Sequence, residues 1–109
     1  MKLITGLFFL LATQVAMAEC SRPAAPQLPD GSSSDLEAMV EGQKAVKAYV
    51  AETEAYLDCL NEESAAAADE ETPEQQLARI ELHNEVVDDM EAVAAAFNEE
   101  IREYKAKSE

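Results

Sequence analysis

The sequence predicts an all-α protein, an antiparallel two-helix hairpin with an extended, polyproline-II-like N-terminal arm packed along it. Three observations support this prediction. Segments 35–62 and 73–105 carry apolar residues in a seven-residue repeat, as helices that pack along a common seam do. An acidic, alanine-rich connector at 63–72 separates them. Before the first helix, the arm at 19–33 has three prolines spaced three residues apart, at 23, 26 and 29, which matches the turn of polyproline II.

Residues 1–18 have the pattern of a signal peptide. Lys2 supplies a positive charge, an apolar run follows, and small residues precede an expected cleavage site between Ala18 and Glu19. A membrane anchor is the competing interpretation, but the apolar run is short for a bilayer span and no basic flank follows it. We therefore expect one mature domain, 19–109, that is periplasmic or secreted and has no stable membrane insertion after cleavage.

The two cysteines, Cys20 and Cys59, are expected to form an intramolecular disulfide, because export places them in an oxidising compartment. An extended arm from Ser33 back to Cys20 spans roughly 40 Å. The helix from Asp35 to Cys59 spans about 36 Å, so the two lengths agree. A Pro-Asp-Gly turn at 29–31 would reverse the chain between them. An intermolecular bridge and two free thiols are the alternatives.

Both helices have recognisable start signals. Ser34 and Glu37 fit a capping box at the first helix. At the second, Thr72 is the expected cap, Pro73 the first helical residue and Gln75 the partner of the cap. The alanines of the connector would also let the first helix continue for another turn.

The seven-residue repeat defines the seam between the helices and its register. The seam of the first helix is expected to contain Leu36, Met39, Gln43, Val46, Val50, Thr53, Leu57 and Leu60. The seam of the second is expected to contain Ile80, His83, Val87, Met90, Ala94, Phe97, Ile101 and Tyr104. Placing Leu57 opposite Ile80 gives the predicted register, and a slip by one helical turn is the alternative.

Beside this seam, small and apolar residues on one side of both helices form a predicted groove for the arm. Residues seven apart on a helix and three apart on polyproline II have similar spacings, so proline rings would meet successive groove positions. A glycine in the groove would allow the arm to approach closely. A disordered linker is the competing interpretation. The residues expected to dock the arm are Pro23, Pro26, Pro29, Gly42, Tyr49, Tyr56, Val86 and Val93.

The only histidine, His83, falls on the predicted seam. A metal ligand or pH switch is one interpretation, but Val87 occupies the position one turn further along the same face. We favour a polar core histidine, bonded to Thr53 or to a carboxylate, that fixes the register.

The arm and first helix resemble a group of small secreted proteins of Gram-negative bacteria. Their pattern is Cys-x-x-Pro-x-x-Pro-x-(Ile/Leu)-Pro-Asp-Gly, followed by a helix with two tyrosines and a cysteine. The matching residues here are Cys20, Pro23, Pro26, Pro29, Asp30, Gly31, Tyr49, Tyr56 and Cys59. The resemblance implies export and this fold, and it implies no activity.

Composition narrows the class of function. The chain has 23 acidic residues against 8 Lys and Arg, and a formal charge of −15. Such a surface repels nucleic acid and anionic lipid, so neither is an expected partner. No catalytic, cofactor-binding or metal-binding motif is present in the sequence, so we expect no enzyme and no cofactor.

We therefore expect a small periplasmic structural or interaction protein, stabilised by one disulfide, that binds another protein of the cell envelope. The alternative is an acidic ligand-handling protein, either a cation buffer or a chaperone-like binder of exposed polypeptide. A monomer is favoured, with weak self-association as the other possibility.

Overall fold

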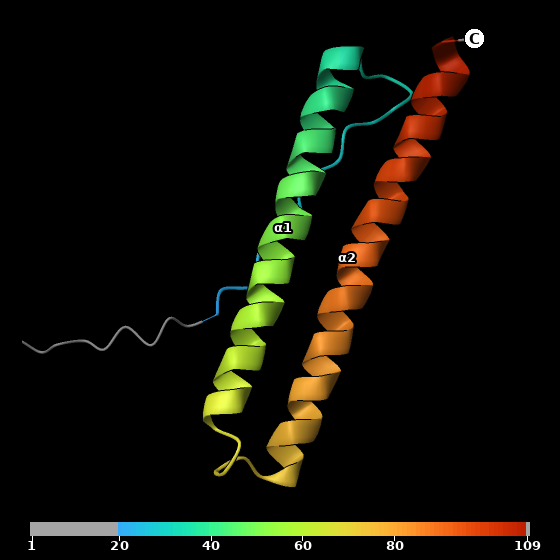
Figure 1. Ribbon diagram of the computed structural model, residues 1–109. Coiled ribbons are helices and arrows are strands. Elements are labelled where there is room, and N and C mark those ends of the chain that lie inside the picture. Colours follow the sequence, from blue (N-terminus) through green and yellow to red (C-terminus); the bar gives the residue numbers. More distant parts are fainter. Residues whose placement is uncertain (1–19, 109) are drawn as a thin grey trace, which may run out of the picture.

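The protein is a hairpin of two long antiparallel helices, as predicted. The computed structural model describes residues 20–108, so the predicted signal peptide lies outside the described residues. Helix α1 spans Leu36–Ala66 and helix α2 spans Pro73–Ser108. The arm precedes α1, and the end of α2 lies beside the start of α1 (Figure 1). Within the described residues there is no strand, and neither helix is long and apolar enough to cross a membrane.

Helix α1 begins with Asp35 as its cap, which corrects the prediction of a capping box at Ser34. A carboxylate oxygen of Asp35 accepts a hydrogen bond of 2.8 Å from the amide of Ala38. Ser34 belongs instead to the preceding turn, because its amide donates to the carbonyl of Asp30 at 2.9 Å. Asp and Ser are about equally good helix caps. Asp35 is the cap here because Ser34 is part of the preceding turn.

Helix α1 ends later than the predicted boundary at 62. It continues to Ala66, and the amide of Ala67 closes it by donating to the carbonyl of Glu63 at 3.1 Å. Alanine has the highest helix propensity, which explains the additional turn. Helix α2 likewise extends to Ser108, beyond the predicted 105.

The start of α2 confirms the predicted capping box. The amide of Thr72 donates to the side-chain oxygen of Gln75 at 3.0 Å, and the amide of Gln75 donates to the hydroxyl of Thr72 at 3.2 Å. Pro73 is the first helical residue, where its missing amide proton removes no helical hydrogen bond. Lys105 and Lys107 lie in the last turn, where the helix dipole favours positive charge.

The core consists of two clusters, and each combines both helices with one residue of the arm. In the cluster near the open end, Leu28 of the arm packs against Met39, Val46 and Phe97. In the cluster nearer the connector, Cys20 packs against Tyr56, Leu57 and Val86. The arm is therefore a third packed element of the fold.

The register of the helices is shifted by about one turn from the prediction. Leu57 was expected opposite Ile80, but it clusters with Val86. Ile80 lies instead with Leu60 and Asn61 around a small hollow. Val86 is 2% exposed although the repeat places it beside the seam, and Cys20 of the arm packs against its cluster. The shift leaves Leu36 and Ile80 largely exposed, at 62% and 46%.

The sequence pattern places Leu57 and Ile80 opposite each other on the seam, so it predicts equal losses of stability when either is truncated. The observed register predicts unequal losses. Leu57→Ala should lower the free energy of unfolding by about 2–5 kcal/mol, because it leaves a cavity in a buried cluster. Ile80→Ala should cost below about 1 kcal/mol, because that side chain is half exposed. Urea denaturation followed by circular dichroism measures both. Equal losses would contradict the shifted register.

Candidate functional site

The candidate site is the arm, described by the structure over residues 20–33, together with the helix surfaces that hold it. Its first residue, Cys20, is bonded to Cys59 near the end of α1, with the two Cα atoms 5.6 Å apart. The predicted intramolecular disulfide is confirmed, and no free cysteine occurs among residues 20–108. The bond closes a loop that contains the whole arm and most of α1. We call this bond the latch.

Next to the latch, an ion pair ties the arm to α2. The guanidinium of Arg22 donates to the carboxylates of Glu85, at 3.2 Å, and Asp89. These acids are four residues apart, on one face of the helix. The hydrogen bond with Glu85 raises the pKa of Arg22 above its ordinary value. Sequence analysis missed this contact, although Arg22 is the only charged residue between Cys20 and Asp30.

At the other end of the arm, Pro29 lies against Gly42 on α1. A Cβ atom built on Gly42 would lie 2.7 Å from Cγ and Cδ of the proline ring, and 3.1 Å from Phe97. Any side chain at this position would push the arm outward. The glycine is therefore the residue that permits the close approach expected from the sequence.

Each of the other expected docking residues is at least partly buried. Pro23 and Tyr56 both line a hollow of about 380 Å³ beside the latch. Tyr49 is buried and Pro26 is half-buried. Val93 packs against the core cluster at the open end.

The turn at the end of the arm, residues 30–32, is held against α2. The amide of Gly31 donates to a carboxylate oxygen of Glu100 at 2.7 Å. A Cβ atom on Gly31 would lie 1.8 Å from the carbonyl oxygen of Glu100, so only glycine fits here. Ser32 donates to the carboxylate of Asp30 through both its hydroxyl, at 2.6 Å, and its amide, at 3.0 Å. These hydrogen bonds lower the pKa of Asp30.

Three carboxylates meet where this turn touches α2. Oxygens of Asp30, Glu100 and Glu103 lie within 4.8 Å of one another. Repulsion from Glu100 raises the pKa of Glu103, and Asp30 adds to this repulsion. Hydrogen bonds with Gly31 and Ser32 already engage two of the three groups. The arrangement thus anchors the turn at an electrostatic cost that depends on pH.

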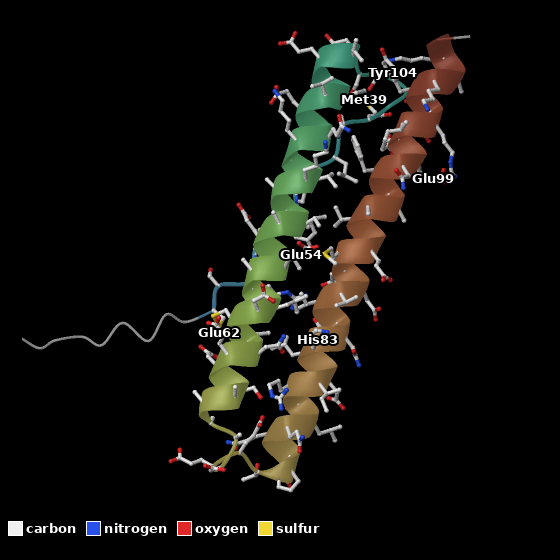
Figure 2. The ribbon with its side chains drawn as sticks, viewed as in Figure 1. Met39, Glu54, Glu62, His83, Glu99 and Tyr104 are labelled. Atoms are coloured by element: carbon white, nitrogen blue, oxygen red, sulfur yellow. A yellow bond between two sulfur atoms is a disulfide. The ribbon has the colours of Figure 1, made fainter. Side chains whose placement is uncertain are left out.

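Thr53 and His83 do not make the predicted polar contact with each other, and each has other neighbours. Thr53 is buried as expected, and its hydroxyl donates to the carbonyl of Tyr49 at 2.6 Å. His83 is half-buried and lines a hollow of about 230 Å³ with Leu60 and Asn61 (Figure 2). The one-turn shift of the register accounts for the separation.

A second ion pair closes the opposite end of the hairpin. Arg79 of α2 donates to both carboxylate oxygens of Glu71 in the connector, at 3.0 and 3.2 Å. The side chain of Glu71 is only 15% exposed. The hydrogen bond between Glu71 and Arg79 raises the pKa of Arg79. This bidentate pair holds the connector against α2. The sequence pattern gave no signal for it, because the partners are eight residues apart across a turn.

Comparison with protein families, curated proteins and solved structures found no match to this chain. The fold and the arm site therefore rest on the chain's own geometry.

Gly42→Ala should destabilise the protein even though alanine is the better helix former. The methyl group would collide with Pro29, at a cost of about 1–3 kcal/mol, against a propensity gain of about 1 kcal/mol. When the latch is removed by Cys20→Ser and Cys59→Ser, the arm can move away and the cost should shrink. A double-mutant cycle on the free energy of unfolding measures this coupling. An unchanged cost without the latch would contradict arm docking at Gly42.

Glu103→Gln should raise the melting temperature at pH 7, because it removes repulsion with Glu100 and Asp30. The raised pKa of Glu103 means that the folded chain binds its proton more readily than the unfolded chain, whose value is near 4.5. The wild-type fold therefore gains stability as the pH falls through this window, and the advantage of Gln should shrink near pH 4. Glu91→Gln, an exposed site elsewhere on α2, is the control. Equal gains at both pH values would contradict this origin.

Proposed function

We propose that this protein is an exported, non-enzymatic interaction protein that binds another protein of the cell envelope. The proposal rests on the signal-peptide pattern and on one structural observation. The arm is fastened at both ends, by the latch and Arg22 at one end and by Gly31 at the other. We assign it a polyproline II conformation, in keeping with its proline spacing. The exported form would begin at residue 19.

Fastening the arm holds the two helices in one arrangement, so the surface on their other side is preorganised and loses little conformational entropy when a partner docks. The arm occupies one side of the hairpin, where it meets Gly42, Cys59 and Glu85. The repeat places Val40 and Leu77 on the opposite side. We propose this opposite side as the partner-binding surface.

Two exposed apolar pairs mark this surface, one near each end of the hairpin. Leu36 and Val40 lie one turn apart on α1, and are 62% and 39% exposed. Leu77 and Ile80 form the corresponding pair on α2, at 58% and 46%. The first pair adjoins a hollow of about 230 Å³ that Tyr104 also lines. These pairs would supply apolar contacts, and the surrounding carboxylates would select a basic partner surface.

Site-specific photo-crosslinking in the native envelope tests the proposal. A photoreactive phenylalanine analogue at Val40 or Leu77 should give the same crosslinked protein, which mass spectrometry then identifies. The matched control is the analogue at Ala24, an exposed residue of the arm, which should not crosslink to that protein. Val40→Glu should weaken binding of the purified partner at least tenfold by calorimetry. Crosslinking to no protein, or equally from Ala24, would contradict the proposed surface.

The alternative function is acidic ligand handling, and the three clustered carboxylates at the turn are the observation that favours it. Calorimetry with calcium, zinc and copper separates the two proposals. Heat of binding that is lost in Glu103→Gln would favour a cation buffer, whereas silence at millimolar metal would reject it. Suppression of aggregation of an unfolded client protein would favour the chaperone-like version.

A further inference from the structure

The strongest unassigned feature is the surroundings of the latch. Both cysteines are only half-buried. The hollow of about 380 Å³ beside it is large enough for a small thiol. Its lining includes Cys20, Cys59 and Glu52. The structure therefore contains an approach route to the disulfide with a carboxylate on its wall.

A second carboxylate lies still closer to the bond. An oxygen of Glu63, one turn beyond Cys59 on α1, is within 4.8 Å of both sulfur atoms. The nearest arm cation, Arg22, points toward α2 and is paired with Glu85 and Asp89. The charge of Arg22 is thus engaged by two carboxylates of α2, and Glu52 and Glu63 are the carboxylates that lie beside the latch.

We propose that Glu63 and Glu52 make the Cys20–Cys59 disulfide an exchange site that selects thiols by charge. Cationic thiols open the bond, and anionic thiols are repelled. The inference rests on the latch and its neighbours, and it is independent of the proposed envelope partner. Its substrate class is a thiol whose reactive sulfur lies beside a positive group.

The chemistry follows ordinary thiol–disulfide exchange. An incoming thiolate attacks one sulfur, the bond between Cys20 and Cys59 breaks, and a mixed disulfide forms while the other cysteine leaves as a thiolate and takes a proton from water. A second thiol resolves the mixed disulfide. Two thiols are thereby oxidised to one disulfide, and the two cysteines are reduced.

Glu63 acts on this reaction in two ways. Its charge repels an anionic nucleophile during approach, which affects anionic thiols most. It also disfavours the leaving thiolate that develops beside it, which slows exchange with every thiol. One unit charge about 5 Å away, in water, changes a rate by about fourfold through either effect. Opening the latch would leave Arg22 and the turn at Gly31 as attachments of the arm.

Reduction kinetics with three small thiols test the proposal. Cysteamine has a cationic head group, 2-mercaptoethanol a neutral one, and 3-mercaptopropionate an anionic one. Free cysteines are trapped with iodoacetamide and counted by mass spectrometry. Rates are divided by the thiolate concentration and by the rate on an uncharged reference disulfide. At low salt, the wild-type protein should react about tenfold faster with cysteamine than with 3-mercaptopropionate, and 0.5 M sodium chloride should reduce this ratio.

Glu63→Gln should speed reduction by all three thiols. It should also lower the ratio of the cysteamine rate to the 3-mercaptopropionate rate to about threefold. Glu52→Gln should lower the ratio without speeding the cationic thiol. The matched control is Glu54→Gln, which removes the same charge from an exposed position on the other side of α1. Circular dichroism confirms that each variant is folded. Both carboxylates are exposed, so the substitutions disturb no core contact.

Three results would overturn the proposal. The first is a wild-type ratio near one at low salt. The second is an equal change of the ratio by Glu54→Gln and Glu63→Gln, which would assign the effect to net charge alone. The third is a reduction rate that does not depend on thiol concentration, which would show that the bond opens only after unfolding.

Discussion

The contact between the arm and the hairpin is the interaction on which the rest of this structure depends. Two helices share only one seam, and a seam of that width buries too few side chains to stabilise a small domain by itself. The arm adds Leu28 to one core cluster and Cys20 to the other. Cys20 packs against the cluster that contains Val86, a residue that is almost completely buried. The helices therefore fold around the arm as much as around each other.

Much of this arrangement could be predicted from the sequence, because its causes are local or periodic. The seven-residue repeat predicted the hairpin. The start of α2 was predicted from Thr72, Pro73 and Gln75. The missing side chain of Gly42 predicted a point where the arm approaches α1 closely, and Pro29 lies there. The lengths of the arm and helix predicted a bond between their ends, and the structure contains it.

The rest could not be predicted because it depends on contacts that only the assembled fold creates. The register shifted because the arm makes the positions beside the seam, such as Val86, part of the core. Asp35 replaced Ser34 as the cap because Ser34 is engaged in the turn that docks on Glu100. Arg22 found its partners 63 and 67 residues away, a separation that no sequence spacing indicates.

The electrostatics of the chain follow from the same contacts. In a strongly acidic protein, like charges repel and weaken the compact state, so the positions of the few cations matter. Arg22 fastens the arm, Arg79 fastens the connector, and Lys107 donates to the carbonyl of Ser34 where the arm meets α1. Two other cations, Lys44 and Arg102, pair with Glu41 and Glu99, so within residues 20–108 most carboxylates have no ion pair. The same distribution that fastens the arm leaves the carboxylates of Glu52 and Glu63 beside the latch, so structure and proposed thiol selectivity have one physical origin.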